Sequence, residues 1–80
     1  MNLESIMFEK GFEIEDTGGG FSAFRKDITE DEYILITKEN DPTIPTDITD
    51  RVMIGYYMSE NDSQLKSESS ILSEFIEKIS

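Results

Sequence analysis

The sequence predicts an α+β fold, in which a four-stranded antiparallel meander carries a short N-terminal helix and a C-terminal helix packed on it. The first observation is a hairpin pattern in residues 11–26, where strand-like segments flank three consecutive glycines. The second is a pair of segments rich in β-branched and aromatic residues, at 33–37 and 51–58. The third is the helical spacing of apolar residues at both ends of the chain. Residues 1–80 are therefore expected to form a single small acidic α+β domain.

The N-terminal helix is predicted from the residues at its two ends. Asn2 suits the N-cap position, and Gly11 suits the left-handed residue that follows a helix. A helix stop of this kind brings Phe12 into contact with Met7. So short a helix is unstable alone, so we expect it to dock on the sheet.

The hairpin that follows is the clearest feature of the sequence. Phe12 and Ile14 alternate with acidic residues, as in a strand with one buried face. A return strand begins at residue 21 and is expected to end at about residue 27 or 28. The turn needs residues that adopt positive φ without steric cost. The structural turn residues are Gly18, Gly19 and Gly20.

The middle of the chain supplies two more strands and a loop. Residues 33–37 are apolar toward both faces, which predicts a central strand. Residues 39–50 are expected to form a loop, because Pro42 and Pro45 cannot donate to the ladder of a central strand. Residues 51–58 then form the last strand, which places this strand at an edge of the sheet.

The C-terminal helix is predicted to follow a turn at residues 59–63, with Asp62 or Ser63 as its cap. The serine-rich segment before Ser70 weakens the first half, so the firm helix is expected to begin near that residue. Its apolar stripe consists of Leu65, Leu72, Phe75, Ile76 and Ile79.

Charge narrows the classes of partner. Eighteen acidic residues against seven basic ones give a formal net charge of −11. This field repels nucleic-acid phosphates and anionic lipid and attracts basic surfaces. We therefore expect no direct nucleic-acid partner and no membrane partner. A charge that serves only solubility explains the same composition.

Residue types exclude most catalytic chemistry. The chain has no histidine and no cysteine, which removes the usual general base, the thiolate nucleophile and the standard zinc sites. We expect no enzyme activity, no cofactor and no metal. The third alternative is a small carboxylate-dependent enzyme, although two-carboxylate hydrolysis needs a cleft that a chain of this size hardly builds.

Three patterns resemble binding motifs but have simpler explanations. The triple glycine precedes a strand-like segment, whereas a phosphate-binding loop opens a helix. The acids at residues 30–32, and Asp47 with Asp50, lack the ligand spacing of an EF-hand loop. A stacking platform for bases would be surrounded by charge of the wrong sign. Its tyrosines would be Tyr33, Tyr56 and Tyr57.

Two groups of acids form a candidate partner-binding patch. They are expected at the ends of neighbouring strands, where negative charges can imitate the spacing of nucleic-acid phosphates. Any strongly acidic domain supplies such charges, so solubility remains the alternative reading. The candidate residues are Glu13, Glu15, Asp16, Glu30, Asp31 and Glu32.

Residues 11 to about 58 contain the pattern GF…DTGGG…A…LIT…P-T…GxY. It is made by Gly11-Phe12, Glu15-Asp16-Thr17-Gly18-Gly19-Gly20, Ala23, Tyr33-Ile34-Leu35-Ile36-Thr37, Pro45-Thr46 and Ile54-Gly55-Tyr56-Tyr57. This pattern resembles that of small uncharacterised phage and prophage proteins. The motifs mark turns and strands, so the resemblance carries over no functional residue. It implies a phage accessory protein, and hence an inhibitor of a host system.

Two hypotheses of different class follow. The first is a non-enzymatic, phage-type acidic protein that binds and modulates or inhibits a basic host protein or nucleic-acid-binding machinery. An anti-CRISPR protein and a nucleic-acid mimic are its specific forms. The alternative is a self-associating accessory protein that pairs as a homodimer through the sheet edge at residues 52–58. The chain has no basic leader and no membrane-length apolar run, so we expect a location in the cytoplasm, that of the host cell if a phage encodes it.

Overall fold

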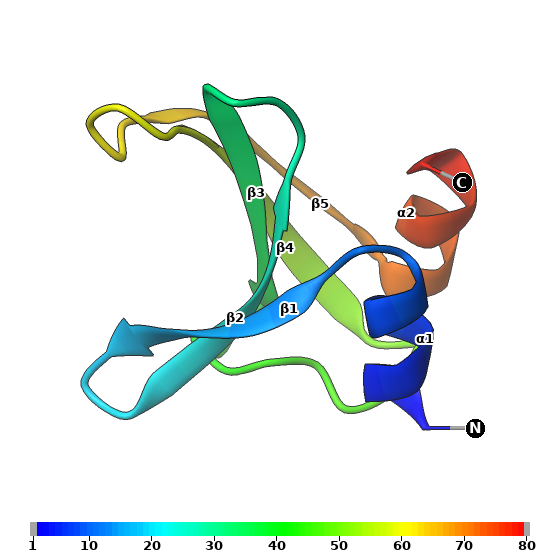
Figure 1. Cartoon of the computed structure of the whole chain (residues 1–80). Coiled ribbons are helices and arrows are strands. Elements are labelled where there is room, and N and C mark those ends of the chain that lie inside the picture. Colours follow the sequence, from blue (N-terminus) through cyan, green and yellow to red (C-terminus); the bar gives the residue numbers. More distant parts are fainter. Residues whose placement is uncertain (1, 80) are drawn as a thin grey trace.

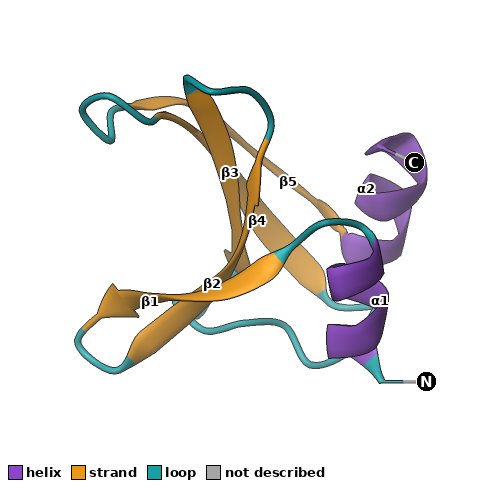
Figure 2. Ribbon diagram, in the orientation of Figure 1, coloured by secondary structure: helices purple, strands orange, loops and turns teal. Residues whose placement is uncertain are grey.

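A computed structural model of the chain describes residues 2–79. Five strands form one antiparallel sheet in sequence order, which confirms the predicted α+β class and the meander. Figure 2 shows that the sheet is strongly curved and that both helices lie on the same side of it. The elements, labelled in Figure 1, are α1 (Leu3–Glu9), β1 (Glu13–Gly18), β2 (Phe21–Asp27), β3 (Glu32–Lys38), β4 (Arg51–Met58), β5 (Gln64–Ile71) and α2 (Leu72–Ile79).

The core lies between the helices and one face of the sheet. Phe24, Ile36 and Ile54 stand opposite one another on β2, β3 and β4, and all three are fully buried. The buried cluster around them consists of Met7, Phe12, Phe24, Ile34, Ile36, Val52, Ile54, Leu72, Phe75 and Ile76. The alternate residues of these strands form the helix-free face. It carries Glu13, Glu15, Ala23, Arg25, Asp27, Tyr33, Leu35, Met53, Gly55 and Tyr57.

Both ends of α1 form as the sequence predicts. The Asn2 side chain caps the helix by accepting from the Ser5 backbone N–H at 2.9 Å. At the other end Gly11 adopts a φ of 92°, and the Phe12 N–H donates to the Met7 carbonyl at 2.9 Å. This hydrogen bond is the signature of the Schellman stop. It turns Phe12 back into the core, where Met7 is also buried.

The predicted hairpin joins β1 and β2. Gly19 and Gly20 have φ values of 63° and 83°, so both residues of the reversal occupy the left-handed region that favours glycine. The Asp16 carboxylate accepts from the Gly18 backbone N–H at 2.8 Å, next to an irregularity in the strand register. The side chain of Asp16 therefore helps to shape the turn.

The C-terminal helix is present, but the prediction for the segment before it is wrong. Residues 64–71 form β5 and not the first half of a helix, so the sheet has five strands and not four. Leu65 belongs to this strand and is 53% exposed. The physical reason is that β4 has a second edge of backbone N–H and C=O groups, and β5 supplies their partners. Because β4 pairs on both sides, residues 52–58 are not an edge strand.

Helix α2 begins at Leu72, so neither Asp62 nor Ser63 caps it. Its first N–H groups are satisfied by the loop between β3 and β4. Leu72 N–H donates to the Asp50 carbonyl and Ser73 N–H donates to the Ile48 carbonyl, both at 2.9 Å. The loop therefore anchors α2 to the sheet. No helix within residues 2–79 has the length and apolar character needed to cross a membrane.

Candidate functional site

Two turns meet at one end of the sheet, at the top of Figure 1: residues 28–31 between β2 and β3, and residues 59–63 between β4 and β5. The Ser59 backbone N–H donates to the Asp31 carbonyl at 2.7 Å, which joins the two turns directly. The Tyr33 hydroxyl donates to the Asp62 carboxylate at 2.6 Å, which ties the second turn to β3. The two turns therefore form one surface.

This surface is strongly negative. Residues 28–32 and 59–63 contain no lysine and no arginine. Of the acidic residues in these two segments, only Asp62 makes an ion pair or a side-chain hydrogen bond within residues 2–79. The charges of the others are therefore available to a partner. We call this set the acidic end: Glu30, Asp31, Glu32, Glu60 and Asp62.

The turn between β2 and β3 satisfies its own backbone and leaves its carboxylates to solvent. The Thr29 hydroxyl oxygen accepts from the backbone N–H groups of Asp31 and Glu32, both at 3.2 Å. The Ile28 N–H donates to the Glu32 carbonyl at 2.9 Å and closes the turn. Because these hydrogen bonds fix the backbone, the acidic side chains project from a rigid base.

Tyr33 supports the acidic end from the helix-free face. Its ring lies between the Arg25 guanidinium, 4.0 Å from the ring centroid, and the Tyr57 ring, whose centroid is 5.3 Å away. Burial raises the pKa of Tyr33 to about 12, and its hydrogen bond to Asp62 acts in the same direction. The hydroxyl therefore stays protonated at neutral pH and continues to hold Asp62. Tyr56 lies on the helix-covered face, so the three tyrosines do not form one platform.

Arg25 is held by two carboxylates of its own chain. It contacts Glu15 at 3.0 Å and Asp27 at 3.1 Å. Partial burial opposes the charge of Arg25, but these two carboxylates outweigh it and raise its pKa. The charge of Glu15 is therefore compensated within the chain.

The six predicted partner-binding residues fall into separate groups. Glu30, Asp31 and Glu32 belong to the acidic end. Glu13 and Glu15 lie on the helix-free face of β1, where Glu13 is exposed opposite Arg25. Asp16 lies on the other face of β1, beside the glycine turn. These six acids do not form one patch, and their role in binding stays a prediction.

The sequence alone did not indicate that Glu60 and Asp62 belong to the candidate site. Their approach to residues 30–32 depends on β5, because only a return strand turns residues 59–63 back over the sheet. Asn61 and Asp62 are residue types that favour turns, so the sequence did contain a signal for a chain reversal here. Asp62 adopts a φ of 56°, a left-handed conformation that aspartate tolerates better than most residues.

An apolar groove adjoins the acidic end. Ile28 belongs to the turn between β2 and β3, and its side chain is 48% exposed. It lines a groove of 310 Å³ between the sheet and α2. The other lining residues are Lys26, Asp27, Ile34, Tyr56, Phe75 and Ile79. Apolar surface and uncompensated carboxylates therefore lie side by side.

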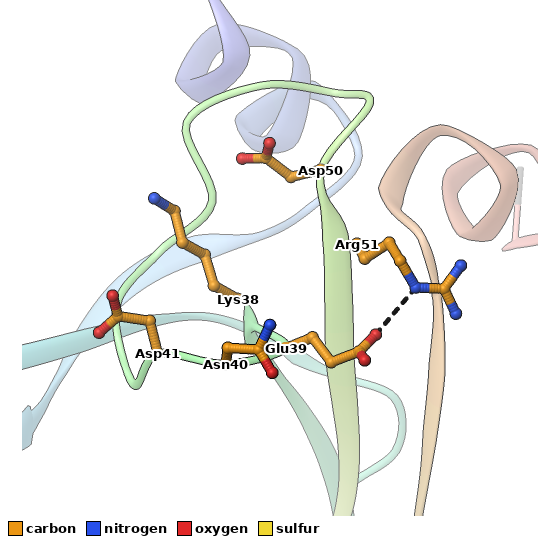
Figure 3. A pocket seen from close by; sticks show the side chains of 6 residues that line it. All are labelled: Lys38, Glu39, Asn40, Asp41, Asp50 and Arg51. Atoms are coloured by element: carbon orange, nitrogen blue, oxygen red, sulfur yellow. Dashed lines mark hydrogen bonds and ion pairs between the residues drawn. The ribbon is translucent and has the colours of Figure 1, made fainter.

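The opposite end of β3 and β4 is different, and we call it the loop end. A pocket of 280 Å³ opens there, lined by Lys38, Glu39, Asn40, Asp41, Asp50 and Arg51 (Figure 3). Arg51 contacts Glu39 at 3.0 Å, and the Ser69 hydroxyl donates to the same carboxylate at 2.5 Å. The hydrogen bonds from Ser69 and then Arg51 lower the pKa of Glu39. Cations and hydrogen-bond donors therefore compensate Glu39 at this end, whereas the Asp41 carboxylate has no such partner within residues 2–79.

No family model, curated protein or solved structure matches this chain. Among residues 2–79, no three acidic side chains gather closely enough to hold a metal ion.

Proposed function

We propose that the protein is a non-enzymatic binding protein whose acidic end engages a basic surface on a partner protein. The observation that carries this proposal is the lack of compensation at this end. Glu30, Asp31, Glu32 and Glu60 have no partner within residues 2–79, although the turns that hold them are tied together by hydrogen bonds.

Rigid presentation gives such a surface an advantage over a flexible acidic tail. Ordering mobile side chains and loops costs free energy on association, and turns that are already fixed reduce that cost. Carboxylates at fixed positions also select partners whose lysines and arginines are spaced to match. Proteins that bind nucleic-acid phosphates carry such cations, which favours nucleic-acid-binding machinery as the partner class.

The groove beside Ile28 supports a protein partner. Protein interfaces combine a buried apolar centre with a polar rim. An apolar side chain of the partner can occupy the groove while its neighbouring cations meet the acidic end. Lysine or polyamine alone would leave this apolar surface unused.

The resemblance to phage and prophage proteins suggests a biological role for this binding. An acidic phage protein that occupies a phosphate-binding surface acts as an inhibitor of host defence, either as an anti-CRISPR protein or as a nucleic-acid mimic. Such an inhibitor works in the cytoplasm of the host cell. It needs no catalytic group and no cofactor.

The test compares two variants with the same net charge. The site variant neutralises four acids of the acidic end as Glu30→Gln, Asp31→Asn, Glu32→Gln and Glu60→Gln. The control variant neutralises four exposed helical acids as Glu4→Gln, Glu9→Gln, Glu74→Gln and Glu77→Gln. Each raises the net charge from −11 by four, to −7. Glu68 is a poor control, because it accepts from Tyr56 and contacts Lys78.

Tagged proteins are incubated with bacterial host lysate at low salt, and the retained basic proteins are quantified with and without competing DNA. We expect the site variant to retain at least about tenfold less of the DNA-competed proteins than the wild type does. Several charge contacts at one interface each contribute to the affinity, so their joint loss has a large effect. The control should retain most of them. Equal losses would show that net charge alone attracts the partner. Failure of the wild type to retain any DNA-competed basic protein would contradict the proposal.

A further inference from the structure

The two edges of the sheet differ in charge. β1 and β5 are the outermost strands, so within residues 2–79 each has an edge that no other strand covers. The β1 edge carries Glu13, Glu15 and Asp16, and charged edge residues discourage pairing with another chain. β5 carries one cation and one anion, Lys66 and Glu68, and is neutral overall. Of the two edges, β5 is therefore the one at which two copies of this acidic chain repel each other less.

Symmetry allows few ways for two copies of β5 to pair. A two-fold axis perpendicular to the sheet places one residue opposite itself, and its neighbours then pair in reciprocal fashion. With Ser67 at the centre, Lys66 lies opposite Glu68 of the partner subunit, and Glu68 lies opposite the partner's Lys66. A register centred on Lys66 or on Glu68 places like charges directly opposite each other. Only the Ser67 register forms two favourable pairs.

The monomer already holds these two side chains on one face. Lys66 lies opposite Tyr56 of β4, and its ammonium is 4.6 Å from the Tyr56 ring centroid. Glu68 pairs with Ile54, accepts from the Tyr56 hydroxyl at 3.2 Å and lies 3.7 Å from the Lys78 ammonium. Both side chains therefore lie on the helix-covered face, where they can contact cross-strand neighbours on the same face.

Small side chains leave the junction open. Ser67 and Ser69 are exposed and lie on the helix-free face, opposite Gly55 and Met53. A serine at the symmetry centre brings no bulk and no charge. β5 pairs with β4 over nearly its whole length, so its backbone is already extended for a further partner.

We infer that a second copy of this chain pairs with β5 in antiparallel fashion, with Ser67 opposite Ser67 of the partner subunit. The two sheets then become continuous. This inference does not depend on the proposed function. It gives the assembly two acidic ends, one on each subunit.

A charge-swap cycle measured by sedimentation tests the register. Lys66→Glu alone places two glutamates opposite each other at both pairs, and Glu68→Lys alone places two lysines there. Each single variant should weaken dimerisation about tenfold, because symmetry converts two favourable cross-strand pairs into two repulsive ones. The double variant Lys66→Glu with Glu68→Lys recreates both pairs in reverse order and should restore the wild-type dissociation constant within about threefold.

Thermal unfolding confirms that each variant is folded before its association is compared. Ser67→Lys is a second variant that leaves Lys66, Glu68 and their contacts with Tyr56 in place. It sets two cations opposite each other at the symmetry centre and should also favour the monomer. A wild type that remains monomeric at tens of micromolar overturns the inference. A folded double swap that stays monomeric while the wild type dimerises overturns the Ser67 register.

Discussion

The two ends of the sheet are both rich in acids, and they use them differently. At the loop end, Asp50 accepts from the backbone N–H groups of Thr46 and Asp47, at 3.0 and 3.1 Å. At the acidic end, the carboxylates of Glu30 and Asp31 have no partner within residues 2–79. The difference shows that net charge does not identify a binding surface. Hydrogen bonding separates acids that hold loops from acids that are free to meet a partner.

The largest stability difference between the two ends should come from a matched pair of alanine substitutions. Asp50→Ala removes the acceptor that closes the loop whose carbonyls hold Leu72 and Ser73 at the start of α2. We expect a loss of about 1–2 kcal/mol, typical of losing a charged acceptor of backbone N–H groups. Asp31→Ala should change stability by less than about 0.5 kcal/mol. Urea unfolding measures both, and equal losses would remove the distinction between the ends.

A smaller effect should reveal how the acidic end is held. Tyr33→Phe deletes the hydroxyl that donates to Asp62 and should cost about 1 kcal/mol. It should also raise the mobility of residues 59–63, which NMR order parameters report. Tyr57→Phe is the matched control, because within residues 2–79 its hydroxyl makes no hydrogen bond. Unchanged order parameters in the Tyr33→Phe variant would mean that the backbone alone fixes the turn.

Alkaline titration of the tyrosines tests the same hydrogen bond between Tyr33 and Asp62. The pKa of Tyr33 rises from 10.0 to about 12, first through burial and then through Asp62. A raised pKa favours the protonated hydroxyl in the folded state, so its contribution to stability is complete below pH 10 and is lost as the pH rises toward 12. Tyrosinate absorbance should show a late component that decreases in Tyr33→Phe. Burial and then Glu68 also raise the pKa of Tyr56, so Tyr56 accounts for the late absorbance that remains. A wild-type titration without that component would contradict the hydrogen bond from Tyr33 to Asp62.

The smallest effect concerns acid stability at the loop end. Hydrogen bonds from Ser69 and Arg51 lower the pKa of Glu39 from 4.5, and the backbone and hydroxyl of Thr49 lower that of Asp47 from 3.8. A lowered pKa contributes stability above the ordinary value, which is lost as the pH falls through the lowered one. Urea unfolding in acid should therefore become less pH-dependent in Glu39→Gln. An acid dependence that is the same in the wild type and in Glu39→Gln would contradict this role of the carboxylate.

Local signals were sufficient for the first half of the fold. Asn2 and Gly11 mark the ends of α1, and three glycines fix the hairpin, because each acts through its own backbone conformation or side chain. The central position of β3 follows from apolar residues on both of its faces. These features depend on neighbours within a few residues, so the sequence displays them directly.

β5 could not be predicted in the same way. Its segment is polar, and the spacing of Leu65 from Leu72 and Phe75 imitates a helical stripe. The strand forms because β4 offers an edge of unpaired backbone groups, and that edge exists only after the sheet has assembled. The same long-range pairing brings Glu60 and Asp62 to the acidic end. The candidate site was therefore only half visible in the sequence, as Glu30, Asp31 and Glu32.

The most direct test of the acidic end is an NMR titration of the isotope-labelled protein with an oligolysine peptide at low salt. The peptide carries cations without the identity of any partner, so it reports where this surface accepts positive charge. We expect amide shifts concentrated in residues 28–32 and 59–63, and their loss in the four-acid site variant but not in its equally charged control. Shifts spread evenly over both helices and both ends of the sheet would contradict the account, because they would show that net charge alone attracts the cation.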